Sequence, residues 1–241
     1  MSAVNQRLFF SFISMTYLLN IHTATEEAMV NICDGKKVLA TLYNNDPKQH
    51  GAFLHKAIKE ILAGQKITPK NLSAVGVTNG PGSYTGIRVG LASAKGLCYA
   101  LGIPLLTFNT LHVMARTLIS EINDPNAFYG PMIDARRMEV FTAVFDFRLN
   151  EVIAPASMIL DNTSFANIVD NNKIFFSGSG SLKFKNMDVK LNAAFYPEIS
   201  ISSVALAICA ESMFLKGQFN DVAYSQAVYL KEFYFPKKEI I

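Results

Sequence analysis

The chain has 241 residues, of which 50% are hydrophobic and 17% charged, and its formal net charge is +3. This composition excludes a disordered chain, and the charge is too small to indicate a basic nucleic-acid-binding domain. At about 150 residues per domain, the length predicts one large or two small domains. Cys33, Cys98 and Cys209 are far apart and never form a CxxC pair, so we expect buried free thiols in a cytoplasmic protein.

The N-terminal stretch 8–21 is apolar and follows a single positive charge, Arg7, which gives it a superficial likeness to a signal peptide. It is too short to span a bilayer and is interrupted by polar residues. We therefore interpret 17–21 as a buried first strand. Residues 1–14 are interpreted as an extension that is disordered or not native, with Met15 as the native start.

Strand-like and helix-like patterns alternate through the first half of the chain. We first predict three strands, at 17–21, 28–33 and 37–43, with a turn at Asp34-Gly35 between the second and third. A helix over 52–63, a strand at 74–78 and a helix over 87–101 that ends at Gly102 follow in that order. The last two elements are a strand at 103–108 and a helix that extends from its N-cap, Thr110, to about residue 119. Strands that alternate with helices through short connections indicate parallel crossovers and an α/β fold.

The second half has weaker patterns. Strands are predicted at 131–134 and 138–147 around an Arg136-Arg137 turn, and another at 173–177. A helix is predicted over 204–216, because its apolar residues recur at intervals of three and four. The stretches 162–172 and 183–192 are predicted to be loops.

A glycine loop with the spacing G-x-G-x-x-x-G connects the strand at 74–78 to the following helix. Such a loop can bind an anion at the helix N-terminus, but the spacing is one residue off the dinucleotide fingerprint, and Ile87-Arg88 replaces the Lys and Ser/Thr of a Walker loop. The alternative is a tight turn with Ser83 or Thr85 as the helix cap. The loop residues concerned are Gly80, Pro81, Gly82, Ser83, Thr85, Gly86 and Arg88.

The helix after the loop has small residues at regular spacing. Gly86, Gly90 and Ala94 repeat every four residues, and a second set repeats in the same way from Ala92. Each interior glycine costs about 1 kcal/mol relative to alanine, so two of them need a reason. The groove they form faces either the protein's own core or a partner. Under the partner interpretation, Gly90→Leu abolishes a complex and leaves the fold intact.

Residues 75–104, VGVTNGPGSYTGIRVGLASAKGLCYALGIP, closely resemble the glycine loop and following helix of the bacterial TsaB (YeaZ) family. That family is the accessory subunit in making threonylcarbamoyladenosine in tRNA. Residues 18–25, 49–50, 133–137 and 227–231 are similar to it as well. The resemblance spans about residues 16–231 and is thin across 150–200.

The resemblance implies an actin-like/Hsp70-like ATPase (ribonuclease-H-like) fold with two lobes, which we place at 15–109 and 110–241. It also implies that the chain is not an enzyme. The catalytic paralogue TsaD transfers the threonylcarbamoyl group, and the ATPase TsaE joins the complex. The chain would then contact tRNA only indirectly and hold neither a metal nor a cofactor by itself. The resemblance leaves open a homodimer without the partner, and ATP or ADP at the complex interface.

In the family the first two helices form the pairing surface, and these match 52–63 and 87–101 here. The interface residues predicted from this match are Phe53, Ala57, Ile61, Gly86, Ile87, Gly90, Leu91, Ala94, Leu97 and Cys98. One position departs from the family, because His22 stands where an Asp is usual. An imidazole does not replace a carboxylate on Mg²⁺, so this change argues against independent ATP hydrolysis.

Two enzyme classes are the alternatives: a metal-dependent glycoprotease-like peptidase and a small-molecule kinase of the actin-like fold. The histidines are His22, His50, His55 and His112. His50 and His55 are five residues apart, off a common helix face, and there is no HExxH motif, so we expect capping or surface roles.

The charged group Asp134, Arg136 and Arg137 also admits two interpretations. These residues could form an interlobe ion pair or contact a partner. A structural role in the turn between two strands is favoured, because such turns commonly carry these residue types.

Overall fold

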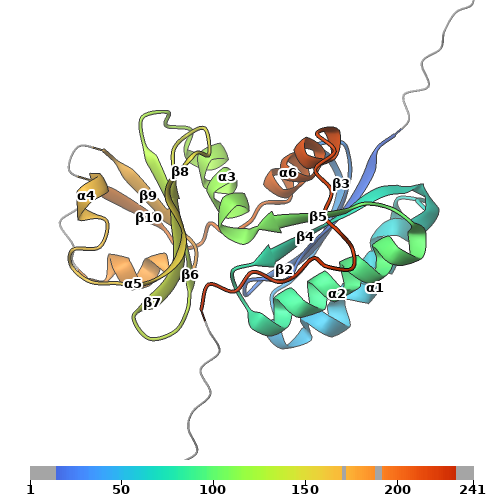
Figure 1. Cartoon of the computed structure of the whole chain (residues 1–241), viewed down its shortest axis with the longest axis horizontal. Coiled ribbons are helices and arrows are strands. Elements are labelled where there is room, and N and C mark those ends of the chain that lie inside the picture. The colour runs from blue at the N-terminus through green and yellow to red at the C-terminus, as the bar shows by residue number, and fades with distance from the viewer. Residues whose placement is uncertain (1–14, 170–171, 188–191, 232–241) are drawn as a thin grey trace, which may run out of the picture.

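The computed structural model describes residues 15–169, 172–187 and 192–231, which form two lobes, each built on a five-stranded sheet (Figure 1). The predictions made for residues 1–14 lie outside these ranges. Within them, no helix combines the length and the apolar character needed to cross a membrane.

The first sheet contains all of the strands predicted for the first half of the chain. They are β1 (Tyr17–His22), β2 (Ala28–Asp34), β3 (Lys37–Asn44), β4 (Leu72–Gly80) and β5 (Leu105–Asn109), in the order β3-β2-β1-β4-β5. The central strand β1 pairs antiparallel with β2 and parallel with β4. Asp34 pairs with Lys37, so the hairpin turn consists of residues 35 and 36, one residue later than predicted.

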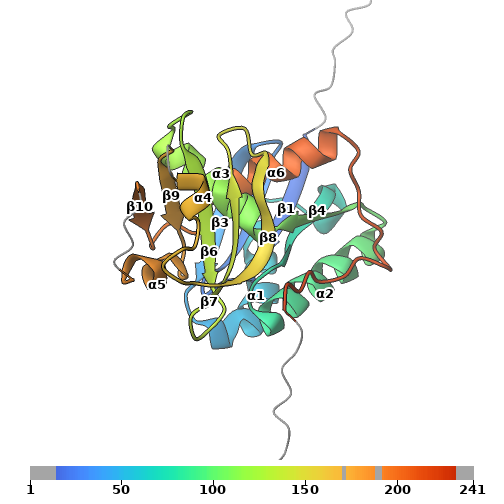
Figure 2. The ribbon, with the colours of Figure 1, turned by 60° about the vertical axis from the view of Figure 1, so that its left-hand side comes forward.

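Helices cover both faces of the first sheet (Figures 1 and 2). They are α1 (His50–Gly64) and α2 (Tyr84–Leu101) on one face, and α3 (Thr110–Ile122) and α6 (Ser203–Leu215) on the other. Successive β1 side chains enter different cores: Leu19 lies in the core under α1 and α2, and Leu18 in the core under α3 and α6. Burial on both faces explains why apolar residues occupy the consecutive positions Leu18 and Leu19.

The second sheet repeats the strand order of the first. It contains β6 (Phe128–Asp134), β7 (Glu139–Phe145), β8 (Glu151–Ile159), β9 (Ile174–Ser177) and β10 (Ala193–Tyr196), in the order β10-β9-β6-β7-β8. Read from β8, this is again two antiparallel pairs followed by two parallel ones. The two lobes therefore have the same sheet topology.

Several elements of the second lobe differ from the sequence prediction. Neither β8 nor β10 was predicted, and two short helices, α4 (Ala166–Val169) and α5 (Ser181–Lys185), lie within or overlap segments predicted to be loops. Both unpredicted strands are at the edges of their sheet and are only partly buried. The predicted N-cap of α3, Thr110, is also wrong. The Asn109 side chain is the one that accepts hydrogen bonds from the backbone N–H groups at the start of the helix.

The C-terminal part of the described chain returns to the first lobe. Asn220 bridges to Leu105 of the edge strand β5, where its backbone N–H donates to the Leu105 carbonyl at 2.8 Å. From there residues 220–231, which we name the strap, run along α2 toward the second lobe (Figure 1). The strap ends at an ion pair between Lys231 and Glu139 of β7. It therefore covers a sheet edge and connects the two lobes.

An aromatic cluster fills the core of the second lobe and supplies a test of this packing. Phe176 is fully buried, with ring centroids 5.1–5.4 Å from those of Phe165, Phe184 and Phe195. We predict that Phe176→Ala lowers the free energy of unfolding by about 3–5 kcal/mol, because it leaves a cavity among these rings. Urea denaturation measures the change. Tyr99→Ala, at a side chain 85% exposed, should change it by less than about 0.5 kcal/mol.

Candidate functional site

The glycine loop packs backbone against backbone on the turn that follows β1. A Cβ atom on Gly82 would lie 2.0 Å from the Ala24 carbonyl oxygen, and one on Gly86 would lie 1.9 Å from the Thr23 carbonyl oxygen. Gly82 also has a φ of +149°, which disfavours any residue with a side chain. These glycines are therefore required by close contact within the chain.

Hydrogen bonds within the chain occupy several donors at the start of α2. The Ser83 backbone N–H donates to the Ala24 carbonyl at 2.7 Å, and the Ser83 hydroxyl accepts from the Gly86 N–H at 3.2 Å. The Ile87 N–H donates to the Ser83 carbonyl at 2.8 Å. Ser83 is therefore the helix cap, and the geometry favours the tight-turn interpretation of the loop over an anion site.

His22, at the end of β1, is buried in a chain of hydrogen bonds. Its Nδ1 lies 2.8 Å from the Thr78 hydroxyl and its Nε2 lies 2.8 Å from the Thr25 hydroxyl. Because the Thr25 hydroxyl donates to the Glu27 carbonyl, Nε2 is assigned as the protonated nitrogen and Nδ1 as the acceptor. Burial, and then the nearby His50, lower the pKa of His22 to about 3. The His22 side chain is therefore neutral, and its two hydrogen bonds join Thr78 to Thr25.

His50 joins the same network from the start of α1. Its Nε2 donates to the Thr25 carbonyl at 3.1 Å, and its Nδ1 accepts from the Asn44 amide at 3.1 Å. Both histidines therefore contact Thr25, a convergence that the sequence analysis did not predict. Among the described residues, no group of three or more His, Cys, Asp or Glu is placed to hold a metal ion.

A cleft of about 450 Å³ separates the glycine loop from the β6–β7 turn. Its lining includes Glu26, Thr85 and Arg136. Asp134 also lines it, but this carboxylate accepts from the Arg136 backbone N–H and pairs with Lys183 at 2.6 Å, both within the second lobe. Asp134 thus has the structural role favoured for this turn, and the interlobe ion pair is formed instead by Lys231 and Glu139.

Arg88, the last predicted member of the glycine loop, contacts the strap. Its guanidinium lies 3.8 Å from the centroid of the Tyr84 ring, and its Nε donates to the Tyr229 hydroxyl at 2.9 Å. Further along α2, the Lys95 ammonium donates to the strap carbonyls of Ala223 and Ser225 at 2.9 and 3.0 Å. One side of α2 is therefore covered by the strap, a contact that the isolated sequence did not indicate.

Most residues predicted for a partner interface are buried in the chain itself. A Cβ on Gly90 would lie 2.3 Å from the Thr23 hydroxyl oxygen, so the groove of Gly86, Gly90 and Ala94 faces β1 and its own core. Phe53 and Leu97 are half-buried and keep some accessible surface. The other eight predicted interface residues are buried and cannot contact a partner, so their assignment to the interface is wrong. They are Ala57, Ile61, Gly86, Ile87, Gly90, Leu91, Ala94 and Cys98.

The exposed side of the two helices carries the second set of small residues. Helices α1 and α2 lie side by side (Figure 1), joined by a hydrogen bond of 3.4 Å between the side chains of His55 and Ser93. A Cβ on Gly96 would meet nothing within 4 Å. We name the exposed surface the outer helix face; it contains Ala52, His55, Lys56 and Lys59 of α1 and Thr85, Ala92, Gly96, Tyr99 and Ala100 of α2.

Comparisons with known proteins agree with one another. A family model described as TsaD, tRNA N6-adenosine threonylcarbamoyltransferase, matches residues 37–233. The chain is 28% identical over 146 residues to the tRNA threonylcarbamoyladenosine biosynthesis protein TsaB of Bacillus subtilis, an alignment that covers 59% of this chain and 62% of that protein. It is 35% identical over 99 residues to the TsaB of Buchnera aphidicola subsp. Schizaphis graminum, covering 41% and 47%. The chain thus spans about half to two thirds of these relatives.

Among solved structures, YeaZ from Pseudomonas aeruginosa superposes with a TM-score of 0.77 at 23% identity, over 90% of this chain and 100% of that one. At this identity the likeness shows the fold. Together with the repeated sheet topology, it confirms the predicted actin-like, ribonuclease-H-like architecture.

The two interior glycines of α2 supply a matched test of which side of the helix is buried. We predict that Gly90→Ala lowers the free energy of unfolding by about 1–3 kcal/mol, because the new methyl group meets the Thr23 hydroxyl. Gly96→Ala should instead raise it by up to about 1 kcal/mol, because it gains helix propensity in open space. Urea denaturation of both variants measures the sign of each change in the free energy of unfolding. Equal effects would contradict the assigned orientation of α2.

The depressed pKa of His22 predicts acid sensitivity. In the folded protein that pKa is about 3, against an ordinary value of 6.5, so the unfolded chain binds more protons between these values. The free energy of unfolding therefore reaches its full value above about pH 6.5. Below that pH, His22 lowers it by about 1.4 kcal/mol per pH unit. Between pH 7 and pH 5, the wild type should therefore lose about 2 kcal/mol more than His22→Gln.

Denaturation curves at the two pH values measure this difference. His55→Gln, at an exposed histidine, is the control and should follow the wild type. Parallel pH profiles for the wild type and His22→Gln would show that His22 is not buried in its neutral form.

Proposed function

This chain belongs to the TsaB (YeaZ) family, and on that premise we propose that it takes part in the biosynthesis of threonylcarbamoyladenosine in tRNA. Its role is that of a non-catalytic, cytoplasmic subunit. It binds and activates the catalytic paralogue TsaD, and the ATPase TsaE joins the same assembly.

The observation that carries the proposal is the outer helix face. Small side chains at Ala92, Gly96 and Ala100 let the backbone of another helix approach closely, and Tyr99 beside them is 85% exposed. An exposed tyrosine supplies a large, rigid contact area and is enriched among residues that dominate binding energy. This surface therefore fits a partner helix from TsaD.

The state of His22 supports a non-catalytic role. An actin-like ATPase needs an anionic or metal-binding group at the turn after its first strand, whereas His22 is neutral and has hydrogen-bond partners at both ring nitrogens. The adjacent glycine loop donates to the chain's own carbonyls. These features support a protein that acts by contact with its paralogue, and they argue against the peptidase and kinase alternatives.

The physical basis of activation is differential binding. A partner surface that fits the outer helix face better in the active arrangement of TsaD than in its inactive one shifts TsaD toward the active arrangement. The strap holds the side of α2 next to this face through Lys95, so the face is presented on a fixed helix. A preformed surface reduces the entropy lost on association.

We predict that Ala92→Arg and Gly96→Arg each abolish co-elution with the TsaD of the same organism in size-exclusion chromatography, because a long charged side chain prevents close helix packing. Ala92→Arg should keep the free energy of unfolding of the wild type within about 0.5 kcal/mol, and Gly96→Arg should not lower it, since both sites are exposed and arginine has a higher helix propensity than glycine. Ala154→Arg, on the exposed surface of β8, is the matched control and should retain the complex.

The same preparations separate the proposal from the enzyme alternatives. The complex with tRNA, ATP and the threonylcarbamoyl donor should modify tRNA, and the Ala92→Arg variant should not support this reaction. An intact complex with both variants would reject the outer helix face as the interface. ATP hydrolysis or proteolysis by the purified chain alone would reject a non-catalytic role.

A further inference from the structure

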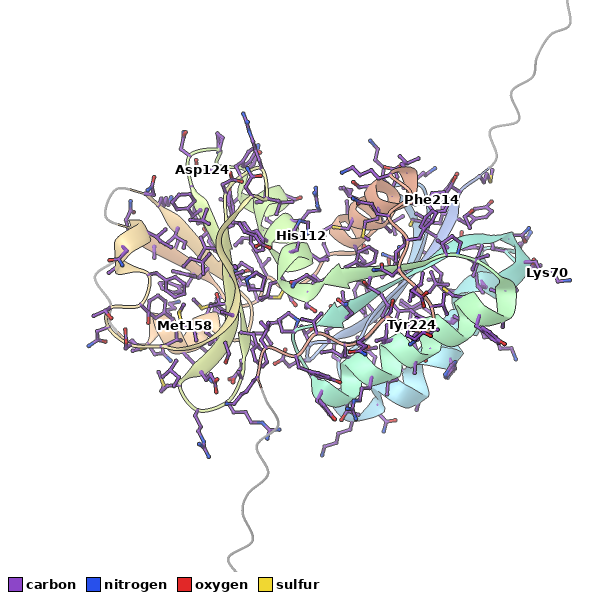
Figure 3. The ribbon with its side chains drawn as sticks, viewed as in Figure 1. Lys70, His112, Asp124, Met158, Phe214 and Tyr224 are labelled. Carbon is purple, nitrogen blue, oxygen red and sulfur yellow. The ribbon has the colours of Figure 1, made fainter. Side chains whose placement is uncertain are left out.

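A second cavity, separate from the cleft beside the glycine loop, lies where α3, α6 and the β7–β8 loop meet. It has a volume of about 360 Å³. Three cationic side chains line it, Arg116 from α3, Arg148 from the β7–β8 loop and Lys216 at the end of α6, and none of the described residues that line it is Asp or Glu. His112 of α3 also lines it, and Figure 3 shows this side chain between α3 and α6. In a chain with a net charge of only +3, this is a concentrated positive site.

The three cations form no direct ion pair among the described residues. The Nε atom of Arg116 is buried without a hydrogen-bond partner. A buried donor of this kind costs about 1–3 kcal/mol unless a ligand or water satisfies it. The Arg116 side chain also hydrogen-bonds to Cys209, so the main reason to expect an anionic ligand is the group of three cations with no carboxylate among the described lining residues.

The nearest carboxylate does not complete the site. Asp146 lies close to Arg148 in sequence, but both of its oxygens organise the β7–β8 loop. They accept from the backbone N–H groups of Arg148 and Asn150 and from the Asn150 amide, each at 2.8 Å. The carboxylate is thus committed to the loop, which it holds in the conformation that places Arg148 at the cavity.

The remaining lining combines neutral polar groups with an apolar side. Ser212 and Gln218 add polar side chains, and Leu149 and Met213 add apolar surface. A free inorganic anion would use only the cations and the polar groups. A ligand with an organic part would use the apolar surface as well, and 360 Å³ has room for both.

We propose that this cavity binds a small phosphomonoester, with its phosphate held by Arg116, Arg148 and Lys216 and its organic part against Leu149 and Met213. Guanidinium groups bind phosphate through paired N–H donors, and Lys216 adds a third positive charge. The inference goes beyond the proposed function, because the cavity is separate from the outer helix face and its occupancy does not depend on a partner chain.

Phenyl phosphate is a suitable probe, because it combines a phosphomonoester with a small apolar group. Isothermal titration calorimetry of the full chain should show saturable binding at one site, tighter than that of inorganic phosphate. Arg116→Gln and Lys216→Gln should each weaken binding about tenfold, the effect of losing one charge-assisted hydrogen bond. Lys70→Gln removes an exposed lysine at the right-hand end of the molecule, away from His112, and should bind as the wild type (Figure 3).

His112 gives an independent readout. Burial, and then the charge of Arg116, lower its pKa in the free protein. A bound dianion favours the protonated ring, so NMR titration should show that phenyl phosphate raises the pKa of His112 in the wild type and in Lys70→Gln. In Arg116→Gln the same shift should require about tenfold more phenyl phosphate.

Three results would overturn the proposal. They are the absence of saturable binding of phenyl phosphate, equal binding by Arg116→Gln, Lys216→Gln and the wild type, and an unchanged pKa of His112 at saturation. A single-stranded RNA oligonucleotide is the comparison ligand in fluorescence anisotropy. If the same variants lose RNA binding and phenyl phosphate does not compete with the RNA, the cavity binds a phosphodiester backbone. The phosphomonoester assignment is then wrong.

Discussion

The close approach of α2 to the turn after β1 is the contact on which the functional surfaces depend. Side chains at residue 82 of the glycine loop and residue 86 of α2 would push both segments away from the backbone of Thr23 and Ala24. With glycine there, the Thr23 hydroxyl donates to the Gly86 carbonyl at 2.7 Å and the Ser83 N–H donates to the Ala24 carbonyl. This contact fixes the rotation of α2 about its axis. The rotation in turn decides which residues face the core, which face the strap and which are exposed.

The same turn connects α2 to the histidine network. Thr25 receives hydrogen bonds from His22 and His50, one through its hydroxyl and one through its carbonyl. A carboxylate buried in place of His22 would need compensating donors or a cation, whereas the neutral imidazole fits between two hydroxyl groups. The turn after β1 thus holds β1, α1 and α2 together.

The order and type of elements in the first half of the chain could be predicted because both faces of that sheet are buried, and buried strands have a strong apolar signal. The edge strand β8 is only partly buried and contains Pro155, which a central strand does not tolerate. Glycine spacing predicted a groove on α2 but not its direction. Gly90 and Gly96 have the same local signature, and only tertiary contacts place one in the core and the other at the surface. The basic cavity was out of reach for a similar reason, because Arg116, Arg148 and Lys216 come from three separate segments.

The position of α6 has a consequence for the order in which this protein folds. The helix follows every strand of the second sheet in the chain, yet it covers one face of the first, where the Asn31 amide donates to the Ser203 carbonyl at 3.0 Å across 172 residues. A chain emerging from the ribosome forms β1–β5 with that face exposed until residue 203 and beyond have been synthesised. Contacts between such distant residues slow folding and prolong the exposure of apolar surface. The first lobe therefore begins to fold first but completes its core last, and during synthesis its unfinished face is the part of the molecule most in need of a chaperone.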